Sequence, residues 1–412
     1  GKPAAVVAAG PSLDQTMPLL SSIRDQVVIV AVGTAYKPLR KAGLTPDFVI
    51  VADGAPVVEK QFTGVDTNGT VLLVPPQVTP GVYEKFDSSC IFTFASGGVV
   101  GFEKCLEEWR LPAASLRTTG TVTIPALSAA AFFGCREIYC FGLDFACRED
   151  RVNHVANTAH EEIGDYVAAD RLDWVPGNMA DWVPVSREMR TYVEQTSRFA
   201  GELADTMGIR ITNVNPGGAR IDNMEHLLPE HFSLDSPFIR DDVEARVDEA
   251  VGSAPRGDPS QTPQRLEDTR KELMQLKCDA ERALALCEEL GREKTLTEKQ
   301  QRSKLSRLQK IEKEMKQNNE AKFLIDGAVQ KSSIQTVNTF ARVEPDREET
   351  EEQEDFKRVH RQAAKFYKLT AKAAEWCRNH LDEVQTRILN ENRESDAGQS
   401  ADTERSRLEG VG

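Results

Sequence analysis

The sequence predicts a Rossmann-like α/β domain with a mostly parallel sheet, followed by an all-α domain. In the first half, short apolar runs alternate with helix-like stretches, as in sheets whose strands are buried on both faces and joined by helical crossovers. In the second half, apolar residues recur at alternating three- and four-residue steps, the pattern of helices packed along a seam. A chain of 412 residues has room for two or three domains at roughly 100–200 residues each.

Seven continuous apolar runs, rich in β-branched residues, are predicted as the strands of the sheet. They cover residues 4–9, 27–32, 48–52, 71–74, 91–95, 138–142 and 209–212. Residues 121–133 are apolar on nearly every side, which predicts a buried helix, and residues 185–207 read as a long helix.

The helical half begins with a regular seam, formed by Leu266, Thr269, Leu273, Leu276, Ala280, Ala283, Cys287 and Leu290. Apolar steps in residues 305–315 and 356–384 predict two further helices, and short connections favour an antiparallel bundle. We interpret this half as a scaffold or a self-association element. The acidic stretch 344–355 is expected to be a solvated linker. The expected domains are residues 1–232 and 263–391, with a linker at 233–262 and a disordered tail at 392–412.

Composition excludes several classes of function. The net charge of −14, without a basic run, argues against nucleic-acid binding. No apolar run reaches the roughly 20 residues that span a bilayer. The eight cysteines lack metal-ligand spacing, which favours reduced thiols in the cytoplasm and no structural zinc. Gly1 is not an initiator methionine and a strand follows almost at once, so we expect the chain to be part of a longer protein.

Gly10, Pro11 and Ser12 follow the first predicted strand. A glycine turn between a strand and a helix lets the backbone approach a phosphate, and the N–H groups at the start of the helix can bind it. The same residues also fit a tight turn in which Ser12 or Asp14 caps the helix. The pattern is neither GxGxxG nor a Walker loop, so the sequence leaves both interpretations open.

Other polar residues follow later strands or precede the buried helix. Thr34 and Asp53 follow the second and third strands, and Asp144 ends the sixth, so all three are expected in one crevice at the carboxyl ends of the strands. Asp53 is a candidate for a ribose hydroxyl or a metal ion, or for an Asx turn. Thr119 and Gly120 precede the buried helix, where they predict a second anion site or an ordinary cap.

Two histidines and two further segments complete the candidates. His154 is the preferred general base, because His160 is followed by two glutamates that would favour its protonated form. Residues 174–182 carry two tryptophans and are either an aromatic lid or a packed surface loop. Gly217 and Gly218 allow close approach of the backbone to a ligand, or a sharp turn.

The ordered set of these motifs resembles a known family. The set is GPSLD, TA after the second strand, PDFVIVAD, TTGTV before the Ala-rich helix, CREIYCFGLDF, a following histidine, and NPGGARI. Over residues 4–222 it resembles the central domain of the Maf flagellin glycosyltransferases, which is related to 6-hydroxymethylpterin pyrophosphokinase-like proteins. Residues 118–145 are also similar to bacterial sialyltransferases.

The resemblance implies a CMP-activated pseudaminic or legionaminic acid as donor and flagellin as acceptor, with no covalent cofactor. By residue, Gly10, Pro11 and Ser12 match the loop around the nucleotide phosphate, and Thr119 and Gly120 match the pair near the donor. Asp144 matches the carboxylate at the strand end. The chain departs from the sialyltransferases after GLDF, where they carry a tyrosine that helps the phosphate leave and this chain carries Ala146.

Three functions compete at this stage. The first is inverting transfer of the sugar to a Ser or Thr hydroxyl, with His154 as base and N–H or hydroxyl donors at Ser12 and Thr119 stabilising the leaving phosphate. The second is diphosphate transfer from ATP to a pterin alcohol, with Mg²⁺ held by Asp53 and Asp144. The third is a degenerate nucleotide fold that serves as a flagellin-binding scaffold.

Overall fold

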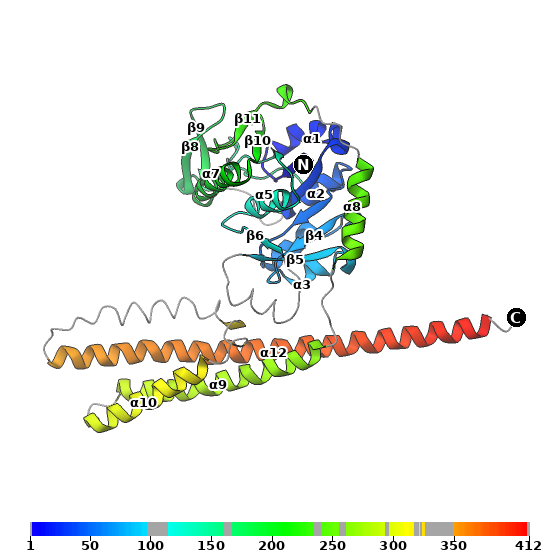
Figure 1. Cartoon of the computed structure of the whole chain (residues 1–412). Coiled ribbons are helices and arrows are strands. Elements are labelled where there is room, and N and C mark those ends of the chain that lie inside the picture. Colours follow the sequence, from blue (N-terminus) through cyan, green and yellow to red (C-terminus); the bar gives the residue numbers. More distant parts are fainter. Residues whose placement is uncertain are drawn as a thin grey trace. The chain divides into compact units, whose positions relative to one another are not determined.

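The computed structural model describes residues 2–96, 114–159, 167–234, 240–254, 261–292, 296–316, 321, 324–325 and 349–409. The chain divides into two compact units, residues 1–256 and residues 257–412 (Figure 1). We describe each unit by itself.

The first unit is built on a nine-stranded, all-parallel sheet. Its spatial order is β11-β10-β7-β1-β2-β3-β4-β5-β6. Strands β2 to β6 therefore follow one another on one side of β1, and β7, β10 and β11 follow one another on its other side. The strands are β1 (Ala4–Val7), β2 (Val28–Val32), β3 (Phe48–Ile50), β4 (Val71–Val74), β5 (Ile91–Ser96), β6 (Ala114–Leu116), β7 (Glu137–Phe141), β10 (Arg210–Val214) and β11 (Glu225–Leu227).

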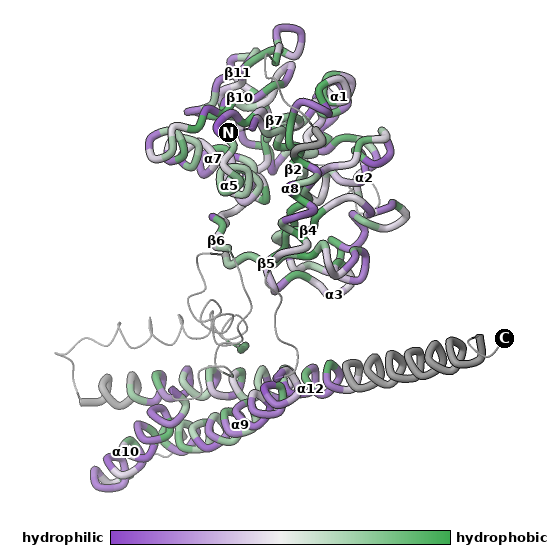
Figure 2. The backbone as a smooth tube through the Cα atoms, turned by 45° about the vertical axis from the view of Figure 1, so that its right-hand side comes forward, coloured by the Kyte–Doolittle hydropathy of each residue, from purple (hydrophilic) through white to green (hydrophobic). Residues whose placement is uncertain are grey.

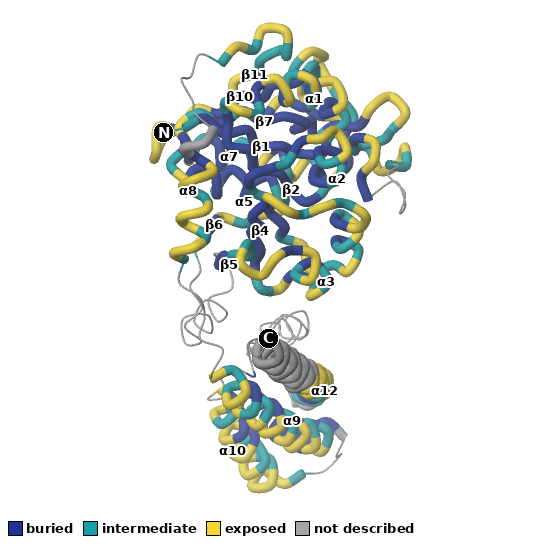
Figure 3. The backbone as a smooth tube through the Cα atoms, turned by 90° about the vertical axis from the view of Figure 1, so that its right-hand side faces the viewer, coloured by how far each residue is buried: buried dark blue, intermediate teal, exposed yellow. Residues whose placement is uncertain are grey.

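All seven predicted strands are present, because each is a run of apolar residues with buried neighbours on both faces. Figure 3 shows these strands as a buried centre beneath helices whose outer sides are exposed. The helices of this unit are α1 (Leu13–Ser22), α2 (Gly33–Lys41), α3 (Pro80–Tyr83), α5 (Thr123–Phe132), α7 (Arg187–Met207) and α8 (Arg240–Ser253). Short 3₁₀ turns lie at Arg24–Gln26, Pro56–Gln61, Ser88–Cys90, Ala169–Arg171 and Pro229–His231.

The α/β unit extends beyond the predicted boundary at residue 232. Helix α8 lies within residues 233–262, which we expected to be a linker. Its Val243 is buried in the core of the α/β unit, and Val247 and Val251 pack against that core. The spacing of these valines, four residues apart, places them on one face of the helix.

The segment with two tryptophans is a β-hairpin and not the packed surface loop that was one of its two predicted forms. Strands β8 (Leu172–Pro176) and β9 (Trp182–Ser186) pair antiparallel, with Trp174 opposite Pro184 and Pro176 opposite Trp182. Alternation along the strands leaves Trp174 and Trp182 exposed, whereas Val175 and Val185 are buried on the opposite face. The sequence analysis also missed the short strands β6 and β11.

The second unit contains α9 (Thr262–Arg292), α10 (Glu298–Met315) and α12 (Glu349–Glu409). All eight predicted seam residues of α9 are buried. Figure 2 shows hydrophobic and hydrophilic residues alternating along these helices. Ion pairs from α9 to α12 (Lys277–Glu375) and from α9 to α10 (Arg282–Glu314) join helices of antiparallel direction. Helix α12 covers residues 349–355 and 392–409, which we expected to be linker and disordered tail.

Across the described part of the chain, no helix has the length and apolar character needed to cross a membrane.

Candidate functional site

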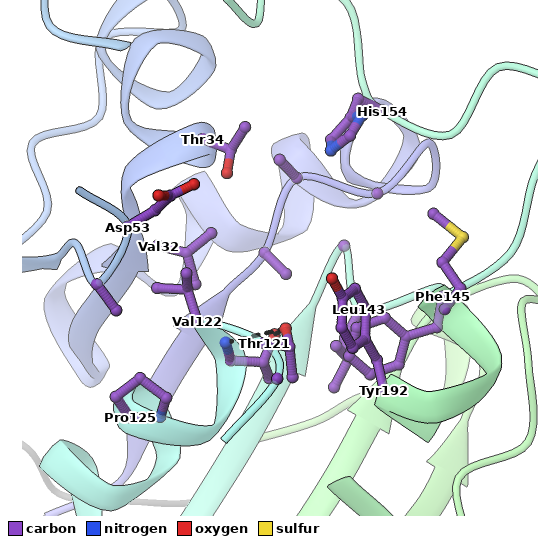
Figure 4. A pocket seen from close by; sticks show the side chains of 18 of the residues that line it. Val32, Thr34, Asp53, Thr121, Val122, Pro125, Leu143, Phe145, His154 and Tyr192 are labelled. Carbon is purple, nitrogen blue, oxygen red and sulfur yellow. Dashed lines mark hydrogen bonds between the residues drawn. The ribbon is translucent and has the colours of Figure 1, made fainter. Parts of the chain in front are cut away.

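A cavity of about 540 Å³ lies at the carboxyl ends of β1, β2, β3, β4 and β7. β1 and β7 are neighbours in the sheet, and here the order of the strands reverses direction. In open α/β sheets, ligands bind at this topological switch point. The cavity is therefore the candidate site of the α/β unit (Figure 4).

The structure brings most of the predicted site residues to this cavity. Those lining it are Gly10, Thr34, Asp53, Thr119, Gly120, Asp144 and His154. Pro11, Ser12, Gly217 and Gly218 do not line it. Ser12 and Gly218 of the second group lie against Asp144.

Asp144 holds the loop that follows β1. Its Oδ2 accepts a hydrogen bond from the Ser12 amide (2.7 Å), and its Oδ1 accepts from the Ser12 hydroxyl (2.5 Å) and from Asn215 Nδ2 (3.2 Å). Only 5% of Asp144 is exposed, and this burial raises the pKa of its carboxyl, while the bonds from Ser12 and Asn215 oppose the rise. The carboxylate is thus used to connect β7, the β1–α1 loop and the segment after β10.

This network changes the interpretation of the GPSLD motif. We predicted that the Ser12 hydroxyl and the start of α1 face a phosphate, but both the hydroxyl and the amide of Ser12 bind the protein's own carboxylate. Ser12 is the N-cap residue of α1 and makes no side-chain capping bond, because its hydroxyl is donated to Asp144. Gly10 is required for the same packing, since a Cβ there would lie 2.5 Å from Asp144 Oδ2.

The double glycine after β10 does not line the cavity, and Gly218 packs against the backbone of Asp144. Gly218 has φ +80° and its Cβ position lies 2.9 Å from the Cα and carbonyl oxygen of Asp144. The amide of the next residue, Ala219, donates to the Asp144 carbonyl oxygen at 2.8 Å. Gly217 has open space around it. Of the two interpretations of this motif, the sharp turn fits the structure.

Two other helices begin at the cavity with no side-chain cap. α2 starts at Gly33 after the N-cap Val32, and α5 starts at Thr123 after the N-cap Val122. Both N-cap residues line the cavity, as does Thr34. The first N–H groups of a helix have no partner within the helix, so the N-terminus of α2 offers donors and a positive dipole end to an anion. At the start of α5 the amides of Thr123 and Ile124 donate to Thr121, and Pro125 has no N–H, so this helix offers its dipole end alone.

Hydroxyl groups surround the start of α5. Thr118, Thr119, Thr121 and Thr123 all line the cavity. Thr121 Oγ1 accepts a hydrogen bond from the Thr123 amide at 3.4 Å, so the residue nearest to a cap is Thr121 and not the predicted Thr119. Gly120 has φ +57°, and a side chain there would overlap the Gln195 amide. Among the described residues that line the cavity there is no Lys or Arg.

Asp53 is the one exposed carboxylate at the cavity among the described residues. Its Oδ1 accepts a hydrogen bond from the Ala55 amide at 2.9 Å, which is the predicted Asx turn. Within the described residues, no group of three His, Cys, Asp or Glu side chains is arranged to hold a metal ion.

His154 lies on the loop after β7, and Figure 4 shows its ring at the cavity. The neighbouring Val155 is buried and donates its amide hydrogen to the Ala9 carbonyl oxygen at 2.8 Å, which fixes this loop to the end of β1. Asn153 also lines the cavity, and its buried Oδ1 has no hydrogen-bond donor among the described residues. The competing histidine, His160, lies outside the described residues.

Sequence reasoning missed the wall of the cavity that comes from α7. Met189 and Tyr192 of this helix line the cavity, and the Tyr192 ring lies 6.0 Å from that of Phe145. Phe145 has φ +43°, which is unusual for a bulky residue. The sequence offered no local signal for Tyr192, because a tyrosine on an amphipathic helix is commonly a core residue.

Ala146, where the sialyltransferases carry a tyrosine, is buried away from the cavity. It packs with Val175 and Val185 of the hairpin, Val193 of α7 and Ala219. A large phenol at this position would have to displace that cluster.

Comparisons with known proteins agree with the resemblance to the Maf glycosyltransferases and to the 6-hydroxymethylpterin pyrophosphokinase-like proteins, and the similarity to sialyltransferases stays a prediction. Residues 1–150 match the family model described as 6-hydroxymethylpterin diphosphokinase MptE-like. The chain is similar in structure to the Maf glycosyltransferase of Magnetospirillum magneticum AMB-1, with a TM-score of 0.63 and 18% sequence identity. The alignment covers 94% of this chain and 58% of that one, so the chain shares its fold and spans little more than half its length. No curated protein matches the chain in sequence.

Proposed function

We propose that the α/β unit transfers a nonulosonic acid, pseudaminic or legionaminic acid, from its CMP-activated donor to Ser or Thr hydroxyls of flagellin. The observation that carries this proposal is the cavity at the β1–β7 switch point, onto which the uncapped starts of α2 and α5 open. The fold shared with a Maf glycosyltransferase supports the reaction class. The seven described cysteines are free thiols, which supports a reducing compartment such as the cytoplasm.

The geometry suits a donor that carries one phosphodiester. The N–H groups at the start of α2, the dipole end of α5 and the hydroxyls of Thr34 and Thr121 would bind its charge, with no Lys or Arg among the described lining residues. Asp53 would accept hydrogen bonds from ribose hydroxyls, and the Asn153 Oδ1 would accept one from an amino or hydroxyl group of the donor.

His154 would act as the general base. It takes the proton of the acceptor hydroxyl as the oxygen attacks the anomeric carbon, and the bond from that carbon to the phosphate oxygen breaks with release of CMP. Both oxygens of Asp144 accept hydrogen bonds from Ser12 and Asn215, so we assign it a positioning role: it holds the β1–α1 loop through Ser12. The catalytic role of Asp144 stays a prediction from the sequence.

A second candidate function is diphosphate transfer from ATP to a pterin alcohol, which the match of residues 1–150 favours. It would use Asp53 and Asp144 as ligands of Mg²⁺. Both oxygens of Asp144 already accept hydrogen bonds from Ser12 and Asn215, so metal binding would require that network to open. Calorimetry separates the candidates: binding of CMP supports sugar transfer, and binding of ATP only with Mg²⁺ supports diphosphate transfer.

The direct test is transfer by the 412-residue chain from CMP-pseudaminic or CMP-legionaminic acid to purified flagellin, measured as a mass increase of the acceptor. Binding of flagellin without binding of CMP would favour the scaffold function. A folded chain that binds neither CMP nor either donor would contradict the proposal.

Replacement of His154 by alanine is expected to reduce transfer by about 10²–10⁴-fold, because a general base contributes about that factor. CMP binding should remain, since His154 acts on the acceptor. His160→Ala is the matched variant and should retain transfer. The reverse result would make His160 the base, and full activity in both variants would exclude a histidine base.

A further inference from the structure

Tyr192 lies in the wall of the cavity beside the loop that leads into α5. Met189, Tyr192 and Gln195 are spaced three residues apart on α7 and so share one face of the helix. Met189 and Tyr192 line the cavity, and Gln195 lies directly against the Gly120 backbone. Tyr192 therefore shares a wall of the cavity with the threonine-rich loop that leads into α5.

The ring of Tyr192 is held by its neighbours. It packs against the Phe145 ring with an interplanar angle of 54°. Phe145 and Met189 in turn pack on the cluster formed by the hairpin, α7 and Ala219. Phe145 keeps a left-handed backbone conformation, φ +43°, which a bulky residue adopts only where the surrounding structure enforces it. A ring fixed in this way presents its hydroxyl to the cavity with little loss of entropy on binding.

The surroundings keep this hydroxyl protonated. Burial raises the pKa of the Tyr192 phenol above its ordinary value, and the carboxylates of Glu188 and Asp53 raise it further. The neutral phenol is a hydrogen-bond donor across the physiological pH range. The lining residues that the structure describes include no Lys or Arg, so the donors that they offer to an anion are N–H and O–H groups.

We propose that the Tyr192 hydroxyl donates a hydrogen bond to the phosphate of the bound nucleotide sugar and stabilises that phosphate as it leaves. The role rests on the proposed function. As the bond between the anomeric carbon and the phosphate oxygen breaks, its electron pair passes to that oxygen, and the added charge strengthens the bond from Tyr192. The phenol keeps its proton, CMP leaves as the anion, and the acceptor proton goes to His154.

The test uses Tyr192→Phe, which removes only the hydroxyl and keeps the ring that packs on Phe145. Two rates are measured in the 412-residue chain: sugar transfer to flagellin, and hydrolysis of the CMP-sugar in the absence of flagellin. Both are expected to fall by about 10²-fold, the loss found for one donor to a developing oxyanion. CMP affinity, measured by calorimetry, should fall by much less, because the bond strengthens only as charge develops.

Tyr139→Phe is the matched control. Tyr139 lies on β7, its hydroxyl donates to Glu137 at 3.4 Å, and it does not line the cavity, so both rates should be unchanged. His154→Ala provides the contrast, since loss of the base should slow transfer more than hydrolysis. This difference separates an effect on the leaving group from an effect on the acceptor.

If wild type transfers the sugar and Tyr192→Phe matches it in both rates, the role of Tyr192 is wrong and the proposed function stands. If Tyr192→Phe lowers CMP affinity as much as the two rates, the residue binds the ground state only, and the proposed stabilisation of the leaving phosphate is wrong. A wild type that binds CMP but releases no sugar from either donor would overturn the proposed function, and this role with it.

Discussion

Asp144 in the α/β unit and Asp279 in the helical unit are both buried carboxylates, with 5% and 1% exposure, yet their partners differ in kind. Asp144 accepts hydrogen bonds from Ser12 and Asn215, which are 132 and 71 residues away. Asp279 on α9 accepts from Gln275 and Arg282, one turn to either side on the same helix. Its second oxygen is buried and has no hydrogen-bond donor among the described residues.

The two units therefore differ in the position of their buried polar side chains relative to the candidate site and to the apolar seam between helices. In the α/β unit, buried polar side chains such as Ser12, Asp144, Asn213 and Asn215 gather at one edge of the sheet and connect loops there. In the helical unit, the buried side chains of Asp279, His360 and Thr370 make hydrogen bonds to residues three or four positions away on the same helix. Polar burial therefore fixes tertiary structure in the first unit and is mainly local in the second.

The largest effect is expected from Asp144→Ala. The change leaves the amide and hydroxyl of Ser12 buried without their acceptor, which costs about 1–3 kcal/mol for each unsatisfied group before relaxation, and Asn215 Nδ2 keeps only its bond to the Leu143 carbonyl oxygen. We expect the unit to lose about 3–5 kcal/mol of unfolding free energy and to lose CMP binding. Hydrogen exchange of peptides from β1, β7 and β10 measures the first, and calorimetry the second.

Asp53→Ala is the control at the same cavity. Asp53 is exposed and makes an Asx turn with Ala55, so its loss should change stability by about 0.5 kcal/mol or little more. Equal protection of the three strands in Asp144→Ala and Asp53→Ala would show that the Asp144 network does not hold the unit together.

The contrast between local and long-range contacts also explains which features could be predicted from the sequence. The strands and the α9 seam were predicted because their signal is local: continuous apolar runs in one case, three- and four-residue steps in the other. The hairpin was not predicted, because β8 and β9 each contain a proline and a tryptophan and lack a clear alternation. Ser12, Asp144 and Gly218 were recognised as special, but only the fold shows that they bind one another.

A smaller effect is expected from replacing His360, which should change how the stability of the helical unit depends on pH. Burial lowers the pKa of His360 below its ordinary value, although a hydrogen bond between its Nδ1 and the Phe356 carbonyl oxygen at 2.7 Å opposes the shift. The unfolded chain then binds more protons than the folded one between the lowered pKa and about 6.5, so stability is complete above pH 6.5 and falls as the pH falls.

His380 on the same helix gives a matched comparison. Its Nδ1 lies 2.9 Å from the Trp376 carbonyl oxygen and its ring lies 3.8 Å from the Trp376 ring, but it is exposed. We expect His360→Gln to reduce the loss of stability of the helical unit between pH 7.5 and pH 5, and His380→Gln to leave that loss unchanged. Urea unfolding followed by hydrogen exchange of α12 peptides measures both. A pH dependence that survives in His360→Gln would assign it to other groups.

The smallest effect is expected from Asp279→Leu, which tests the other side of the comparison. Removing the carboxylate does not leave a buried partner, because Arg282 is 53% exposed and can be solvated by water. Replacing a buried charged group by an apolar one of similar volume is often neutral or stabilising. We expect a change in unfolding free energy within about 1 kcal/mol in either direction. Asp279→Asn, which keeps the shape and one acceptor, should behave in the same way. A loss of about 3 kcal/mol or more in Asp279→Leu but not in Asp279→Asn would show that Asp279 connects elements beyond its own helix, as Asp144 does, and the comparison between the two units would fail.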